Sequence, residues 1–342
     1  MEKLFSIIIP CYNAAEYIDR AMTSVIGQTV CRSLYEVIVV DDASTDDTLS
    51  CLNNWKNKYP ETVKVITYST NLRQGGARNR AIRQAVGQYI CFLDADDWMD
   101  ADALETFMVG TKENMDIVTA KYEENYEYPD NHTKEAHNTT SKACIETMFG
   151  HDDMCKYIST NLGYVWSSVY KRSIILENNV WFPEHLAYED IYWQRLIKYY
   201  AQSSCLVNRV THHHYNHPGS TMNTRNAAHH VDRLTCYEMY LEEIRKRHLL
   251  EKYYGQILND TMETYIYNSF YMFFMNMDDI PDVYGRIRET IYRYFPDWEK
   301  VYDDSDIPMV FQYLLKFIKK AKSARPEDLQ PFKDAISELV SE

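Results

Sequence analysis

The sequence predicts an α/β protein in which a mainly parallel sheet is flanked by helices and followed by an all-helical C-terminal extension. Within the first 120 residues, short apolar runs alternate with segments of helical spacing. That alternation is typical of a parallel sheet covered on both faces. Beyond about residue 225, Pro and Gly become rare, and Tyr, Met and Leu recur every three or four residues. This second pattern is typical of packed helices.

Each strand expected in the first half is mainly apolar, which indicates burial on both sides. The expected strands are Phe5–Ile9, Glu36–Val40, Val63–Tyr68, Tyr89–Leu93 and Asp116–Ala120. The expected helices are Glu16–Ile26, a segment through Lys58 that Ser44 or Thr45 could cap, Gly76–Val86 after Gly75, and about Ala101–Glu113.

The second half is less regular at first. Residues 121–143 are polar and rich in turn formers, so we expect a loop or an irregular hairpin there. We expect further strands at Trp166–Tyr170 and Val210–Tyr215, and an amphipathic helix at Ile191–Tyr200 that opens on Glu189 and Asp190. The C-terminal helices are expected at 228–249, 256–277, 281–294, 308–322 and 326–341. We therefore divide the chain into a domain of residues 1–224 and a helical region of residues 225–342.

Composition excludes several classes of protein. The net charge of −14 argues against a nucleic-acid partner, and an anionic ligand would need local cations. The eight cysteines form no CxxC pair, and several lie in apolar runs as buried thiols do. Neither a signal peptide nor a run of about 18 apolar residues is present. We expect a cytoplasmic protein that could associate with the inner face of a membrane.

The segment from Tyr89 to Asp97 is the most informative stretch of the chain. Five apolar residues are followed by Asp94, Asp96 and Asp97. A buried strand that ends in acids places oxygen ligands at the carboxyl edge of a sheet, where open α/β folds bind ligands. Three such charges repel one another, and a divalent metal that holds a diphosphate would relieve the repulsion. The alternative is a surface turn with helix-capping aspartates.

Polar side chains follow the other expected strands as well. Tyr12 and Asn13 follow the first strand, Asp41 and Asp42 the second, and the segment from Asn71 to Arg78 the third. Convergence at one edge favours a ligand site more than any single motif does. The chain has neither the Gly-x-Gly-x-x-Gly pattern after its first strand nor a P-loop, which disfavours dinucleotide and P-loop sites.

Together these motifs resemble the inverting GT-A glycosyltransferases of family 2, over about residues 4–222. The motifs are Ser6-Ile7-Ile8-Ile9-Pro10-Cys11-Tyr12-Asn13, Val39-Val40-Asp41-Asp42-Ala43-Ser44-Thr45-Asp46, Ala77-Arg78-Asn79, Leu93-Asp94-Ala95-Asp96-Asp97 and Tyr188-Glu189-Asp190. The chain departs from the family pattern at Ala43, where Gly is usual, and at Arg73, where Gly is common. The resemblance implies a GT-A type, Rossmann-like fold for the first domain.

The resemblance also implies roles for individual residues. Asp190 would be the catalytic base, with Glu189 beside it to position the acceptor or the base. Asp96 would ligate Mn²⁺ or Mg²⁺, and Trp166 would lie on the acceptor side. The residues implied to bind the nucleotide sugar are Pro10, Tyr12, Asn13, Asp42, Arg73, Arg78, Asp94 and Ala95.

The implied activity is inverting, metal-dependent transfer of a sugar from a nucleoside-diphosphate donor, with UDP expected. The acceptor would be a hydroxyl of a glycan or a lipid-linked glycan, in bacterial surface polysaccharide synthesis. One rival is a sugar nucleotidyltransferase, which needs a Gly-rich phosphate loop where this chain has Pro10-Cys11-Tyr12-Asn13. The other rival is a degenerate nucleotide-sugar binding module, and retention of Asp96 and Asp190 argues against it.

The sequence allows more than one interpretation of two segments. Adjacent histidines on a strand point to opposite faces, so at most two of His212, His213 and His214 share a side, and His214 or His217 could touch metal or phosphate. The segment Met309–Lys322 is amphipathic with a cationic C-terminal end, so it could contact an anionic membrane or only face a core. The C-terminal region could be an acceptor clamp, a homodimer interface or a membrane contact.

Overall fold

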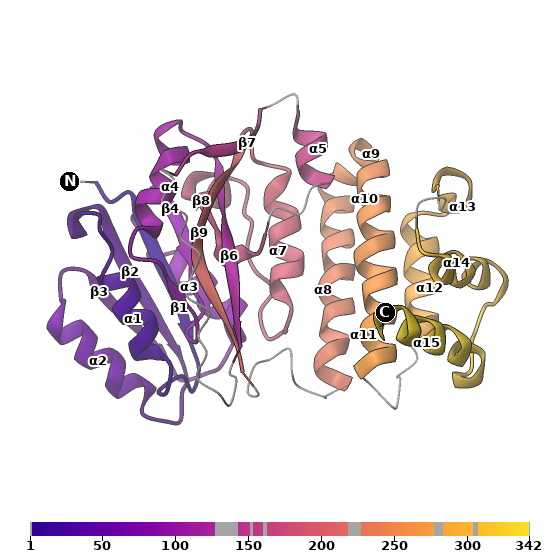
Figure 1. Cartoon of the computed structure of the whole chain (residues 1–342), viewed down its shortest axis with the longest axis horizontal. Coiled ribbons are helices and arrows are strands. Elements are labelled where there is room, and N and C mark those ends of the chain that lie inside the picture. Colours follow the sequence, from indigo (N-terminus) through magenta and orange to yellow (C-terminus); the bar gives the residue numbers. More distant parts are fainter. Residues whose placement is uncertain are drawn as a thin grey trace. The chain divides into compact units, whose positions relative to one another are not determined.

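A computed structural model describes residues 2–126, 143–150, 153–159, 163–217, 227–276, 283–303 and 307–341. The chain folds as two compact units, Met1–Asn223 and Thr224–Glu342. In the first unit helices flank a sheet, and the second unit is built of helices (Figure 1). The expected fold class, with its helical C-terminal extension, is confirmed.

The first four strands in the sequence run parallel and lie side by side in the order β3-β2-β1-β4. They are β1 (Phe5–Cys11), β2 (Tyr35–Asp42), β3 (Val63–Tyr68) and β4 (Tyr89–Phe92). Every residue of β1 and β4 is buried, as expected for strands covered on both faces. The carboxyl ends of these four strands therefore meet at one edge of the sheet.

The rest of the sheet is mixed. Beyond β4 the order is β8 (Ser168–Lys171), β6 (Ile117–Tyr126), β9 (Ser204–Asn216) and β5 (Trp98–Met99), and β7 (Ile145–Phe149) pairs with β9. Since β8 is antiparallel to β4, it begins at the edge where β4 ends. Both β6 and β9 run the opposite way to β8 and end at that edge. The residues before β8 and after β9 are thus brought to the acids that follow β4.

Helices cover both faces of the sheet. On one face α1 (Ile18–Ile26), α2 (Thr48–Lys58) and α4 (Ala103–Lys112) share a core with the odd-numbered residues of β1. On the other face lie α3 (Arg73–Ile82) and α7 (Glu189–Lys198). There Phe92 of β4 meets the edges of Phe182 and Trp193, with ring centres 5.6 Å away in each case. The first unit also contains α5 (Met154–Ser159) and α6 (Arg172–Glu177).

Several expected boundaries were wrong. Ser44 and Thr45 do not cap α2, which begins at Thr48 after Asp47; Ser44 Oγ instead accepts a hydrogen bond of 3.0 Å from the Asn13 N–H. Trp166 lies in a 3₁₀ turn, Val165–Ser167, and not in a strand. The expected loop at 121–143 begins as the end of β6, and its residues 127–142 lie outside the described residues.

The described part of the second unit contains only helices. They are α8 (Ala227–Lys246), α9 (Leu249–Lys252), α10 (Tyr254–Asp260), a π-helical segment (Thr261–Tyr267), α11 (Asn268–Asn276), α12 (Val283–Tyr294), α13 (Trp298–Val301), α14 (Met309–Lys320) and α15 (Pro326–Ser341). Across the described ranges of the whole chain, none of the helices has the length and apolar character needed to span a membrane.

Replacement of Ala43 by Gly tests a strained position. Ala43 has a φ of +66°, in the left-handed region that a side chain disfavours. We expect Ala43→Gly to raise the free energy of unfolding by about 1 kcal/mol, measured by urea denaturation. Ala77→Gly, in the middle of α3, is the matched control and should lower it by about the same amount. A loss of stability in Ala43→Gly would contradict the strain.

Candidate active site

Three carboxylates follow β4 at the carboxyl edge of the sheet. The side chain of Asp96 is 31% exposed, that of Asp94 is less so, and Asp97 is buried. Burial, and then the charge of Asp94, raises the pKa of Asp96. Burial also raises the pKa of Asp97 to about 6, against a hydrogen bond from His214. The cluster is thus electrostatically unfavourable as three free anions, as the sequence indicated.

Arg78 of α3 joins this loop to the start of α7. Its buried guanidinium donates from Nη2 to Asp94 Oδ1 over 2.7 Å and from Nη1 to Glu189 Oε1. Burial alone would lower the pKa of Arg78, but the carboxylates of Asp94, Glu189 and Asp190 outweigh it and raise that pKa. One side chain therefore brings together the Asp-x-Asp segment and the Glu189-Asp190 pair.

Close backbone approach fixes the same junction. A Cβ on Gly75 would lie 2.1 Å from the Pro183 carbonyl oxygen and 3.1 Å from Glu189 Cγ, so α3 can approach this segment only with glycine there. The Asn79 side chain adds two hydrogen bonds of 2.9 Å, donating to the Phe182 carbonyl and accepting from the Phe182 N–H. The chain leading into α7 is therefore held against α3.

The Glu189 and Asp190 side chains differ in their surroundings. Glu189 is buried, and burial raises its pKa to about 7 although the Arg78 charge opposes the rise. Asp190 is half-buried in the first turn of α7, and its Oδ1 accepts a 2.9 Å hydrogen bond from the Ile191 N–H. Asp190 is the more accessible of the two carboxylates.

Apart from Arg73 and Arg78 of α3, the residues implied to bind the nucleotide lie at the ends of β1, β2 and β4. Tyr12 is 53% exposed, whereas Pro10 and Ala95 are buried. Asn13 Oδ1 accepts from the Thr45 N–H over 2.8 Å, which ties the first loop to the second. These positions agree with a shared site, and their contacts with a nucleotide stay predictions.

Asp42 and Arg73 have surroundings that the sequence did not reveal. The Asp42 carboxylate is buried and accepts from the Leu72 N–H, at 2.9 and 3.1 Å, and from Arg80 Nη1 at 3.1 Å. Burial raises its pKa although both of these contacts lower it. Arg73 is exposed and begins α3 with a φ of +61°, which explains why Gly is common there in the family.

Two histidines from the end of β9 pair with two acids of the cluster. His217 Nε2 lies 3.2 Å from Asp96 Oδ2, and His214 Nδ1 lies 3.3 Å from Asp97 Oδ2. The hydrogen bond with Asp97 raises the pKa of His214 to about 9. His213 points to the opposite face, against Asp100, as strand alternation requires. Within the described ranges, no group of three or more His, Cys, Asp or Glu side chains is arranged to hold a metal ion.

Sequence reasoning missed Arg20. Its guanidinium lies over the rings of Trp98 and Tyr215, 4.3 Å from each ring centre, and its Nη2 donates to the Asp96 carbonyl over 2.6 Å. Arg20 therefore positions the backbone of Asp96. A single arginine in α1 carries no sequence signal for this role, because Trp98 and Tyr215 come from distant segments.

Trp166 is placed differently from the expectation of an acceptor contact. The side chain is only 8% exposed, and both of its faces are covered. Tyr164 stacks on it with ring centres 5.1 Å apart, and His214 stacks on it at 5.5 Å. The outer ring of this stack is Tyr164.

Known proteins resemble this chain in sequence and in fold. Residues 6–175 match the model of glycosyl transferase family 2. The chain belongs to that family. Among curated relatives, it is 36% identical over 188 residues to the poly(ribitol-phosphate) beta-glucosyltransferase of Bacillus spizizenii, a match that covers 53% of this chain and 27% of that protein. The chain therefore spans only about a quarter of the length of that relative.

Two solved structures share the fold of this protein. TarS 1-349 of S. aureus, in complex with UDP-GlcNAc, matches with a TM-score of 0.64 and 19% identity, covering 99% of this chain and 92% of that one. The mannosyltransferase PcManGT of Pyrobaculum calidifontis, in complex with GDP-Man and Mn²⁺, matches with a TM-score of 0.51 and 15% identity, covering 98% and 86%. At these identities the likeness concerns the fold alone.

The Glu189→Gln variant tests the burial of that carboxyl through the pH dependence of stability. Burial raises the pKa of Glu189 from 4.5 to about 7. The stability that the proton contributes is therefore present below pH 4.5 and is lost as the pH rises through about 7. We expect wild type to lose on the order of 2 kcal/mol relative to Glu189→Gln between about pH 5 and pH 8, measured by urea unfolding.

The difference between the two proteins is the informative quantity, because the other titrating groups, Asp97 among them, are present in both. A difference that stays constant over this pH range would contradict a raised pKa at Glu189.

Proposed function

We propose that this protein is an inverting, metal-dependent glycosyltransferase that moves a sugar from a UDP donor to a hydroxyl of a glycan acceptor, in bacterial surface polysaccharide synthesis. One observation carries the proposal. Arg78 bonds to Asp94, within the Asp-x-Asp segment, and to Glu189, next to Asp190. The segment implied to hold the donor and the residue implied to activate the acceptor therefore lie on either side of one guanidinium.

The donor would lie along the carboxyl ends of β1, β2 and β4. The exposed ring of Tyr12 suits stacking on a nucleobase, and the exposed Arg73 suits a diphosphate. We propose UDP rather than GDP as the donor nucleotide, because the structure in complex with UDP-GlcNAc matches with the higher TM-score, 0.64 against 0.51. A polymeric acceptor is supported by the relative named for poly(ribitol-phosphate).

Mn²⁺ or Mg²⁺ would be held by Asp96 and His217. Their donor atoms lie 3.2 Å apart, and a divalent ion would relieve the repulsion that raises the pKa of Asp96. One carboxylate oxygen and one imidazole nitrogen suit Mn²⁺ better than Mg²⁺, which prefers oxygen ligands alone. When bound, the ion would supply positive charge against the negative charge that gathers on the departing diphosphate.

Asp190 would act as the base. The acceptor hydroxyl oxygen forms the new bond to the anomeric carbon, the bond from that carbon to the diphosphate oxygen breaks, and the hydroxyl proton passes to Asp190. Attack opposite the leaving group inverts the configuration. Glu189 is buried against Arg78 and would position its neighbour rather than take the proton.

Neither rival gains support from the geometry. A nucleotidyltransferase needs a Gly-rich phosphate loop after the first strand, and β1 here runs through Pro10 and Cys11 into Tyr12 and Asn13. A binding module without chemistry has no need for an accessible carboxylate at Asp190 or for a histidine paired with Asp96.

Asp190→Asn is the decisive variant for this activity. Asparagine keeps the size of the side chain but cannot take a proton, so transfer should fall by about 10²–10⁴-fold while UDP affinity stays unchanged. The measurements are nucleotide release from a panel of UDP- and GDP-sugars with Mn²⁺, with and without EDTA, and calorimetric titration with UDP.

Glu105→Gln is a matched control, because Glu105 also lies in the first turn of a helix, α4, and its carboxylate accepts a 3.1 Å hydrogen bond from Thr29 Oγ1. It should keep full activity. Wild-type turnover that is insensitive to EDTA would refute the dependence on a metal. Full activity of Asp190→Asn would refute Asp190 as the base.

A second proposal concerns α14, which we assign to contact with the inner face of a membrane. Met309 and Tyr313 are 67% and 55% exposed, and the exposed Lys316 and Lys320 continue the same stripe at steps of three and four residues. Residues 307–326 contain five cations and no acid, in a chain of net charge −14. Such a stripe complements anionic lipid head groups.

The double charge reversal Lys316→Glu/Lys320→Glu should weaken sedimentation with phosphatidylserine vesicles by about tenfold or more. The control is Lys246→Glu/Lys252→Glu, which reverses two charges on other helices of the same unit. Equal binding of wild type and both variants would refute the membrane contact.

A further inference from the structure

We propose that Tyr164 is the platform for the acceptor, and that the part of the acceptor lying on it is an uncharged sugar ring. This inference rests on the proposed glycosyltransferase activity and adds to it the chemical class of the acceptor. It follows from three observations: which ring of the aromatic stack is exposed, where that ring is anchored, and which charges surround it.

The first observation is the order of the stack. Trp166 lies between His214 and Tyr164, and its planes are tilted by only 16° and 13° from theirs. Tyr122 of β6 meets Trp166 and Tyr164 edge-on, with ring centres 5.0 and 5.3 Å away. Because Trp166 is covered on both faces, it cannot offer a face to a ligand. Tyr164 is 42% exposed and ends the stack.

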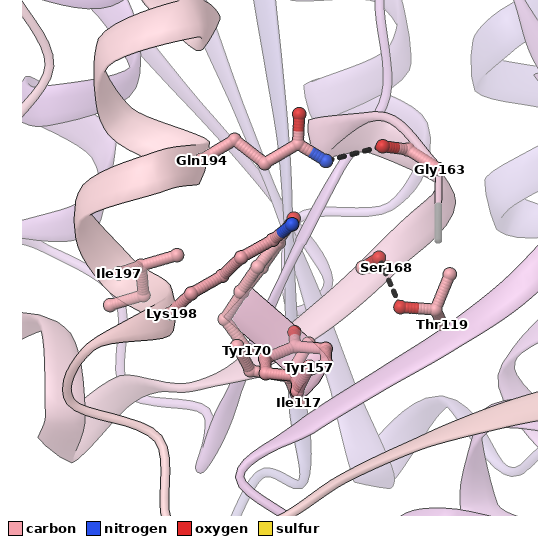
Figure 2. A pocket seen from close by; sticks show the side chains of 9 residues that line it. All are labelled: Ile117, Thr119, Tyr157, Gly163, Ser168, Tyr170, Gln194, Ile197 and Lys198. Carbon is pink, nitrogen blue, oxygen red and sulfur yellow. Dashed lines mark hydrogen bonds between the residues drawn. The ribbon is translucent and has the colours of Figure 1, made fainter. Parts of the chain in front are cut away.

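The second observation is that contacts connect Tyr164 both to the acid cluster after β4 and to helix α7, which carries Asp190. Through Trp166, the stack reaches His214, whose Nδ1 pairs with Asp97 in the acid cluster. On the other side, Gln194 of α7 donates a hydrogen bond to the carbonyl of Gly163, the residue before Tyr164 (Figure 2). Gln194 is one helical turn beyond Asp190, on the same face of α7. Tyr164 thus stands on the side of the base.

The space behind this turn is too small for a sugar. Gly163 and Gln194 also line an internal cavity of about 10 Å³ together with Ser168 and Tyr170 (Figure 2). That volume holds about one water molecule. This cavity is too small for an acceptor ring, so we place the ring on the outer face of Tyr164.

The third observation is the charge on this face. The side chains that share the face of Tyr122 at the end of β6 are Glu124 and Tyr126, and their partners on β9 are His212, His214 and Asn216. In these described strand ends the face carries no Lys or Arg, and His214 is matched by the Asp97 carboxylate. Glu124 would repel a phosphodiester and accept hydrogen bonds from sugar hydroxyls.

An aromatic ring with a nearby carboxylate therefore fits the C–H face and hydroxyl rim of a neutral pyranose. A polyol-phosphate chain offers no ring to stack and carries the wrong charge. The acceptor inferred for this protein therefore differs from the one in the name of its relative, poly(ribitol-phosphate).

The test compares wild type, Tyr164→Ala and Tyr164→Phe. Nucleotide release from the preferred donor is measured without acceptor, with a pool of neutral p-nitrophenyl β-pyranosides, and with short ribitol-phosphate and glycerol-phosphate chains. We expect only the neutral pool to stimulate wild type. Tyr164→Ala should raise the KM for the stimulating glycoside by about tenfold with acceptor-free hydrolysis unchanged, and Tyr164→Phe should stay close to wild type.

Tyr271→Ala, which removes a ring that is 39% exposed on α11, controls for the loss of any tyrosine and should leave the KM unchanged. The unchanged acceptor-free rate reports that Tyr164→Ala is folded. Stimulation by the polyol phosphates alone, no stimulation by the neutral pool, or an unchanged KM in Tyr164→Ala would each overturn the inference while hydrolysis of the donor persists. Absence of all donor turnover would instead overturn the proposed function.

Discussion

The buried contact of Arg78 with Asp94 and Glu189 is the interaction on which the arrangement of this edge depends. Two carboxylates from separate elements share one guanidinium that is itself almost fully buried. Removal of the cation would leave both acids uncompensated, which typically costs about 3–5 kcal/mol. The Nε of Arg78 has no hydrogen-bond partner within the described ranges, so its arrangement does not satisfy every donor. The contact therefore serves to place two acids more than to maximise stability.

The topology of the sheet explains why residues so distant in sequence share this edge. In a purely parallel sheet only the segments after each strand would reach it. Here β8 runs in the opposite direction, so the turn that precedes it, with Tyr164 and Trp166, arrives at the same edge. The long β9 returns to parallel and ends there, which delivers His214 and His217 to Asp97 and Asp96.

The sequence predicted what is local and missed what depends on distant contacts. The parallel strands and the acids after β4 were predictable, because each is written in a few consecutive residues. Glycine-like backbone at Ala43 and Arg73 was also signalled, since both positions depart from a Gly in the family pattern and both have positive φ. The short strands β5 and β7 were missed, because they are defined only by their pairing with β9.

The candidate site shows the same division. The resemblance implied that Asp94, Arg78 and Glu189 belong to one site and assigned Arg78 to the nucleotide sugar. The ion pairs of Arg78 with both carboxylates are visible only in the folded chain. The sequence pointed to an aromatic residue at Trp166, yet the exposed ring is Tyr164, because stacking on His214 covers the other face of Trp166. The contact of Arg20 with the Asp96 carbonyl had no sequence signal at all.

The arginines at this edge of the sheet show how much positive charge an acidic protein has available to hold an anionic donor. Arg78 is bound to two carboxylates, Arg80 to Asp42, and Arg20 to a carbonyl. The charges of Arg78 and Arg80 are therefore already matched by carboxylates when a diphosphate arrives. With a net charge of −14 behind it, the edge would then attract a donor through the exposed Arg73 and an added cation. A divalent ion between Asp96 and His217 would meet that need where the acids are most crowded.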